Sequence, residues 1–89
     1  MKDITIDCQG FVPRSDLHKA FAEALSFPDH YGNNLDALHD CLTEIAEPTR
    51  IRLLNWAVAE ERLGNYARAT KRAILEAAIE NTTLAVLFD

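Results

Sequence analysis

The residues in this sequence that could do chemistry are four carboxylates spaced about one helical turn apart. They lie within a segment that holds six acids and no lysine or arginine between Lys19 and Arg50. Side chains three or four positions apart share one face of a helix, so these acids would form a negative stripe. Such a stripe suits the capture of a strongly basic partner, although a solvated helix face is an equally simple explanation. The four residues are Asp36, Asp40, Glu44 and Glu47.

Catalysis and metal binding find little support in the other side chains. His39 next to Asp36 or Asp40 is the one available acid–base pair, and neither a glycine-rich phosphate loop nor a serine elbow occurs. On a helix the adjacent side chains of His39, Asp40 and Cys41 point in different directions, so they cannot ligate one ion together. No pair of histidines or cysteines has the spacing of a zinc site. We therefore expect neither an enzyme nor a metal or other cofactor.

Length and composition predict one small globular domain that covers residues 1–89. Hydrophobic residues make up 48% and charged residues 26% of the chain, which argues against disorder. No apolar run is long enough for a membrane span, and the first residues do not have the pattern of a signal peptide. Cys8 and Cys41 alone cannot form a disulfide framework. We expect a cytoplasmic protein that has no membrane partner.

The net charge of −5 disfavours a general affinity for nucleic acid, which usually requires a positive face. A small nucleic-acid-binding or regulatory domain stays open as the alternative function. It would use basic residues in the third and fourth predicted helical segments, which could equally well offset nearby glutamates. These residues are Arg62, Arg68, Lys71 and Arg72.

Three predicted strands would carry the helices that position the acids. Alternating apolar and polar residues over 2–8 predict a half-buried strand, and residues 51–54 predict a short second one. The nearly continuous apolar run over 83–88 predicts a strand that is buried on both faces, or nearly so. Because helical segments separate the strands, a parallel sheet is favoured. The expected fold is α/β, a small three-stranded parallel sheet packed with helices.

The first helix is expected to begin at Ser15, a good N-cap, and to end before Pro28. A short helix over residues 56–63 should stop at Gly64, and Asn65 can cap a longer helix that follows.

The second helix, which carries the acidic stripe, is expected to follow a turn-forming loop and to run until Pro48. Either Asn33 or Asn34 can cap its start. Its apolar side chains would all fall on the side opposite the acids and face the core. They are Leu35, Leu38, Cys41, Leu42 and Ile45.

The run YGNNLDALHDCL over residues 31–42 resembles the signature of the barstar family, small cytosolic inhibitors of barnase-type secreted ribonucleases. The similarity extends over essentially the whole chain, with Pro28 before the loop, Pro48 after the helix, and Glu76 and Glu80 before the last strand. The resemblance implies the same α/β fold. It also implies that Pro48 matches a proline that the best-known member of the family holds in the cis form.

The resemblance further implies that the acidic helix and its preceding loop plug the active site of a basic extracellular ribonuclease or nuclease toxin in a one-to-one complex. Asp40 matches the central aspartate that takes the place of a substrate phosphate. Asp36 matches an aspartate that pairs with an active-site arginine. Glu76 matches a glutamate that supports the same basic cluster, and Glu80 matches a more peripheral acid. The free inhibitor is expected to be a monomer.

Other expected partner-binding residues lie around these acids. Asn34 and Thr43 match hydrogen-bonding residues at the rim of the family interface, and Glu44 belongs to the acidic stripe. The family's best-known member has aromatic residues at three interface positions where this chain differs. This departure leaves the identity of the cognate nuclease open, but not the inhibitor class. His39, at the second of these positions, could make binding depend on pH, or could be a surface histidine without a partner. The three residues are His30, His39 and Ile45.

Overall fold

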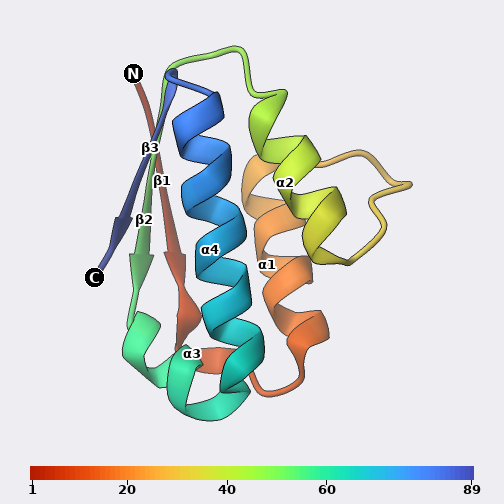
Figure 1. Cartoon of the computed structure of the whole chain (residues 1–89), viewed down its shortest axis with the longest axis vertical. Coiled ribbons are helices and arrows are strands. Elements are labelled where there is room, and N and C mark those ends of the chain that lie inside the picture. The colour runs from red at the N-terminus through yellow and green to blue at the C-terminus, as the bar shows by residue number, and fades with distance from the viewer.

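The chain folds into a three-stranded parallel sheet with helices, and a computed structural model describes all of residues 1–89 (Figure 1). The strand order is β1-β2-β3, and both pairs of neighbouring strands are parallel. The predicted α/β class with a small three-stranded parallel sheet is thus confirmed. The elements are β1 (Lys2–Asp7), the 3-10 helix η1 (Cys8–Gly10), α1 (Arg14–Leu25), α2 (Leu35–Thr43), β2 (Thr49–Leu54), α3 (Trp56–Leu63), α4 (Asn65–Glu80) and β3 (Leu84–Phe88).

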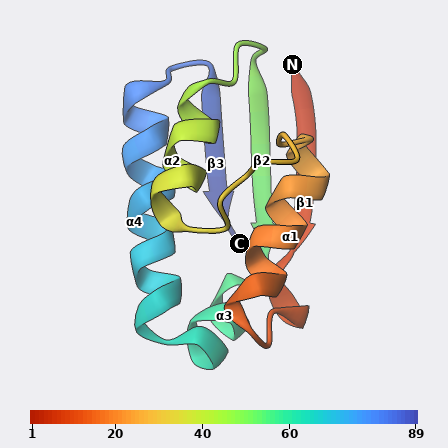
Figure 2. The same cartoon turned by 90° about the vertical axis from the view of Figure 1, so that its right-hand side faces the viewer.

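Helices α1, α2 and α4 all lie on one side of the sheet, and α3 lies near one end of it (Figures 1 and 2). Burial therefore alternates along β2, where Ile51 and Leu53 face the helices while Arg50 and Arg52 are exposed. None of the helices is long and apolar enough to cross a membrane.

The prediction that the last strand is buried on both faces is wrong. In β3 only Leu84 is buried, and Leu87 exposes 47% of its surface. The reason is that β3 is an edge strand of a sheet whose other face no helix covers, so its outward residues meet solvent although they are apolar. Apolar composition alone could not distinguish this strand from one between two helical layers.

The core between the sheet and the helices fixes the orientation of α2. Leu38 and Leu42 of α2 are fully buried, as is Phe21 of α1. Burying a side chain of this size contributes about 1.5–3 kcal/mol. On α4 the buried residues Ala67 and Ala77 are small, which allows that helix to lie close to its neighbours. Because one side of α2 is held in the core, its opposite side must face solvent.

The starts of two helices differ from the prediction. Helix α1 begins at Arg14, with Pro13 in the N-cap position, so Ser15 lies within the first turn and does not cap it. The carboxylate of Asp16 instead accepts a bond from the backbone N–H of Val12 at 3.4 Å. Asn65 is the first residue of α4 and not its cap, because Gly64, with φ of 56°, occupies the N-cap position.

Helix α2 is shorter than predicted, because it ends at Thr43 rather than at Pro48. The side chain of Asn81, just after α4, donates to the backbone carbonyls of Leu42 at 3.0 Å and Ile45 at 2.9 Å. These bonds satisfy carbonyls at the end of the helix and hold the chain in a non-helical path. Glu47 and Ile45 therefore lie beyond the helix. All peptide bonds are trans, including the one before Pro48.

Candidate protein-docking surface

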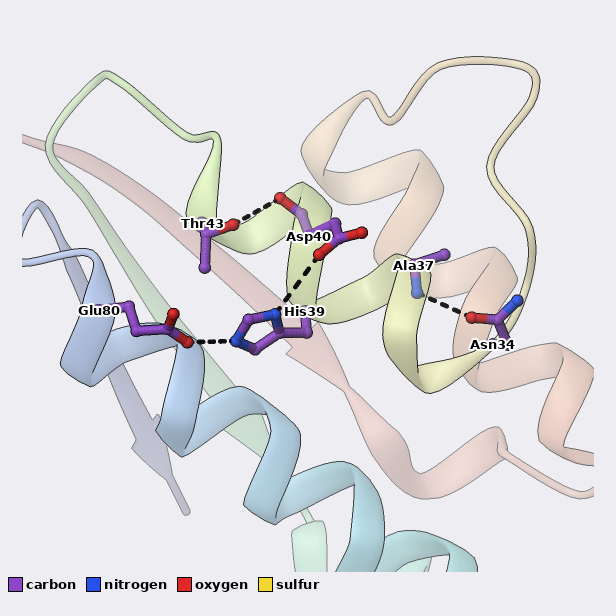
Figure 3. Close-up of polar contacts among 6 residues, drawn as sticks. All are labelled: Asn34, Ala37, His39, Asp40, Thr43 and Glu80. Atoms are coloured by element: carbon purple, nitrogen blue, oxygen red, sulfur yellow. Dashed lines mark hydrogen bonds and ion pairs between the residues drawn. The ribbon is translucent and has the colours of Figure 1, made fainter.

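The loop before α2 and its cap set where the acidic helix begins. The side chain of Asn34 accepts a hydrogen bond from the backbone N–H of Ala37 at 2.8 Å, the geometry of an N-cap (Figure 3). Its amide nitrogen also donates to the carbonyl of Gly32 at 3.3 Å. Asn33 turns the chain with φ of 53°. Of the two asparagines that could cap the helix, Asn34 is the one that does.

The solvent side of α2 exposes its carboxylates, and no lysine or arginine pairs with them. Asp36, Asp40 and the C-cap residue Glu44 are all exposed, and the side chain of Asp40 exposes 77% of its area. No lysine or arginine nitrogen lies within 4.0 Å of any of these carboxylates. The acidic stripe therefore has three members rather than four, because Glu47 lies beyond the end of the helix.

His39 joins α2 to α4 by a hydrogen bond. Its Nε2 contacts Oε2 of Glu80, and its Nδ1 lies 3.6 Å from Oδ1 of Asp40 (Figure 3). The hydrogen bond to Glu80 raises the pKa of His39, with a smaller contribution from Asp40 and partial opposition from desolvation. Of the two interpretations of this histidine, the one without a partner is wrong. The contact holds Glu80 beside the acids of α2.

Glu76 reaches the same region from one turn earlier on α4. It lines, together with Asp36 and His39, a cavity of about 370 Å³ between α2 and α4. Glu76 and Glu80 are both exposed. We call the combined area the docking surface. Its residues are Asp36, His39, Asp40, Glu44, Glu76 and Glu80.

The remaining predicted contact residues lie at the edges of this docking surface. His30 is exposed and lines a second cavity, of about 230 Å³, together with Asp40 and Glu44. The hydroxyl of Thr43 donates to the backbone carbonyl of Asp40 at 2.8 Å, so it closes the end of the helix (Figure 3). Ile45 is half-buried and packs against the core, which leaves only part of its side chain for a partner.

Comparison with known proteins places the chain in a family. Residues 1–88 match the family model described as Barstar (barnase inhibitor). The chain belongs to the barstar family. A protein of Bacillus subtilis (strain 168) named "Putative ribonuclease inhibitor YrdF" is 41% identical over 78 residues, which cover 86% of each chain. The resemblance carried by residues 31–42 is thereby confirmed, and members of the barstar family are inhibitors rather than enzymes.

One residue that positions the barstar-family loop was missed by sequence reasoning. His18 of α1 exposes only 1% of its surface, and its Nδ1 and Nε2 lie 2.7 Å from the hydroxyl of Tyr31 and 2.6 Å from that of Tyr66. Burial lowers the pKa of His18, and the charge of Arg14 lowers it further. The imidazole thus ties α1 and α4 to the loop before α2. The sequence feature that could have indicated this role is the position of His18 between Leu17 and Phe21, which are buried on the apolar side of α1.

The basic residues behind the nucleic-acid alternative do not share one environment in this barstar-family chain. Arg68 donates to the side chain of Asn65 at 2.5 Å, and the Lys71 ammonium lies 4.9 Å from the centre of the Phe88 ring. Arg72 lines the cavity between α2 and α4. These three residues therefore differ in their immediate contacts, and the net charge of −5 still disfavours a general affinity for nucleic acid.

Proposed function

We propose that this barstar-family protein inhibits a basic extracellular ribonuclease or nuclease toxin and protects the cytoplasm of the cell that makes both proteins. It would act as a single domain over residues 1–89, monomeric when free, in a one-to-one complex. The observation that supports this proposal is that Asp36, Asp40 and Glu44 are exposed and have no lysine or arginine partner.

The proposed mechanism follows from the chemistry of the target. An enzyme that cleaves RNA must stabilise phosphate charge, so its cleft contains arginine, lysine and histidine side chains. A rigid helix that presents carboxylates one turn apart competes with the RNA backbone for these cations. A carboxylate can accept two parallel hydrogen bonds from one arginine. Asp40, the middle one of the three acids of the stripe on α2, would occupy a phosphate position, and Asp36 would pair with an arginine.

The other parts of the docking surface would extend the contact. Glu76 and Glu80 bring negative charge from α4 to the same side of the molecule. The second cavity, beside Asp40, would receive a side chain of the nuclease between His30 and Glu44. Asn34, Thr43 and the accessible part of Ile45 would form the rim. A negative surface of this kind also attracts a basic partner over distance and accelerates association.

Titration of ribonuclease activity tests the proposal directly. Purified barnase and other secreted ribonucleases of its type are mixed with increasing amounts of the inhibitor, and cleavage of a fluorescent RNA is followed. We expect activity to fall linearly to zero at one inhibitor per enzyme for at least one nuclease. Prior occupation of the active site by a non-hydrolysable RNA analogue should slow association. Unchanged cleavage across the panel, or salt-dependent retention of the inhibitor on immobilised RNA, would contradict the proposal.

A further inference from the structure

The cavity between α2 and α4 contains a positive charge that an acidic docking surface does not require. The cavity is lined by Asp36 on α2 and by Arg72 and Glu76 on α4. Ala69 and Ala73, one turn apart on α4, are too small to fill it. Figure 2 shows α2 beside α4 along this boundary. At about 370 Å³ the cavity has room for a side chain of a partner.

Arg72 is exposed, and the protein itself does not neutralise it. No carboxylate oxygen lies within 4.0 Å of its nitrogens, whereas Arg50 and Arg52 each have an acidic partner on the sheet. Arg68 is bonded to Asn65, and Lys71 lies over Phe88. Of these three basic residues of α4, only Arg72 lines the cavity beside the docking surface.

An unpaired guanidinium at this position affects which nuclease can bind. A partner whose rim holds only lysine and arginine would place like charges together, and like-charge juxtaposition at an interface costs affinity. A partner with an aspartate or glutamate beside its cations would match Arg72 together with Asp36 and Glu76, which line the same cavity. Guanidinium binds carboxylate through two parallel hydrogen bonds, which gives this match geometric specificity as well as energy.

We infer that Arg72 is a specificity-determining residue, which selects ribonucleases that carry an acidic side chain beside the cations bound by Asp36 and Glu76. The inference rests on the proposed function and names one further property of its partner. Arg72 acts in both directions, because it attracts a nuclease with that acid and repels one with a cation there. The acidic residues of the docking surface then supply attraction in general, and Arg72 supplies discrimination.

The substitution Arg72→Gln separates this role from simple charge attraction. The variant is more negative, so attraction to a basic enzyme alone predicts faster association and equal or tighter binding. Our inference predicts that the nuclease bound most tightly by the wild type dissociates about tenfold to a hundredfold faster from the variant. Arg68→Gln, one turn away on α4 and outside the cavity, makes the same charge change and should leave dissociation unaltered. Kinetics against barnase and a panel of secreted ribonucleases of its type provide the measurement.

A charge exchange then tests the chemistry of the partner. In the tightest-binding nuclease each acidic residue at the rim of the cleft is changed to lysine in turn. One of these changes should weaken the wild-type complex by at least about tenfold, and Arg72→Glu should restore binding to that nuclease alone. Circular dichroism of each variant verifies folding, which is expected because Arg72 is exposed and glutamine is a good helix former.

The possible failures are distinguishable. If the wild type inhibits a nuclease, but Arg72→Gln dissociates no faster than Arg68→Gln, the inference is wrong and the proposed function stands. If no acidic residue of the nuclease shows restored binding with Arg72→Glu, the inference is again overturned. If neither the wild type nor any variant binds a nuclease of the panel, the proposed function fails and the inference falls with it.

Discussion

The docking surface and the outer face of the sheet both carry charged side chains, but only the sheet pairs its carboxylates with arginines. On the sheet, Nε of Arg50 donates to Oδ1 of Asp3 at 2.8 Å, and Nε of Arg52 lies 3.7 Å from Oδ2 of Asp89. On the docking surface the sole basic contacts of the acids are those of His39. The carboxylates of Asp3 and Asp89 are thus paired with arginines, whereas those of the docking surface have no arginine partner, within one chain of 89 residues.

The difference shows which charges remain available to a partner. A paired surface carboxylate is already partly satisfied, although such pairs contribute only about 0.2–1 kcal/mol to stability. Like charges one turn apart destabilise a helix by about 0.2–0.5 kcal/mol per pair, which offsets part of what Asp36 gains from its place in the first turn of α2. Under the proposed function, the chain tolerates this cost where binding would require it and pairs charges elsewhere, which is the usual opposition between stability and function.

The largest expected effect is that of Asp40→Ala on affinity for the nuclease. Removal of a carboxylate that binds buried cations in the complex should weaken binding by roughly 10²- to 10³-fold, a range that itself rests partly on barnase–barstar measurements. Asp3→Ala makes the same charge change on the outer face of the sheet, and should alter affinity by less than about twofold. Calorimetric or kinetic titration of both variants against one inhibited nuclease gives the comparison. Equal small effects would remove Asp40 from its central role.

Salt should act next most strongly, and on association more than on dissociation. Screening of the docking surface is expected to slow association by about 10- to 100-fold between low and physiological ionic strength. The double variant Asp36→Asn, Asp40→Asn should have a much shallower dependence. Asp3→Ala should retain the wild-type slope, because Asp3 lies outside the docking surface. An association rate that ignores salt would show that the acids do not steer the encounter.

The fold was largely predictable because its signals are local. Period-two alternation located β1, the positive φ of Gly64 agrees with its expected role as a stop between α3 and α4, and the separation of strands by helices implied a parallel sheet. The end of α2 was not predictable, because Asn81 closes it from the far end of α4. The exposure of β3 was missed for a related reason. Its environment depends on the strand order and on which face of the sheet is covered, and neither can be deduced from residues 84–88 alone.

The candidate site was predictable as a set of acids, but not as an arrangement. Helical spacing placed Asp36 and Asp40 on the solvent side of α2, because Leu38 and Leu42 had to face the core. The contact between His39 and Glu80 joins residues on different helices, and local pattern holds no information on such a pair. His18 was missed because each of its partners, Tyr31 and Tyr66, is distant in sequence.

His39 should make the affinity of the docking surface depend on pH by several-fold. Its pKa is raised by Glu80, so acidification protonates it and places a positive charge between the acids that a basic nuclease must contact. Binding should therefore weaken as pH falls from about 8 to about 6. The nuclease has titrating groups of its own, so the informative quantity is the difference between the wild type and His39→Gln measured against the same enzyme. Identical pH profiles for the two inhibitors would exclude a role for His39.

His18 offers the converse case, an effect on stability with little effect on affinity. Its folded pKa lies below the ordinary value of 6.5, so the unfolded chain takes up the proton first on acidification. The stability that neutral His18 contributes is therefore present above about pH 6.5 and is lost as pH falls towards the folded pKa. The raised pKa of His39 acts in the opposite sense, because its contribution is present in acid and is lost as pH rises.

Urea unfolding of His18→Gln and His39→Gln at several pH values separates these contributions. We expect His18→Gln to be less stable by about 1–2 kcal/mol at neutral pH, since the hydroxyls of Tyr31 and Tyr66 lose a buried partner. Its stability should also decline less than that of the wild type below about pH 6.5, because the titrating group is gone. Nuclease affinity of the folded variant should stay within about twofold, as His18 lies outside the docking surface. A large loss of affinity at unchanged stability would instead show that the buried imidazole contributes to binding. It would do so through the loop before α2, because the hydroxyl of Tyr31 in that loop is hydrogen-bonded to His18.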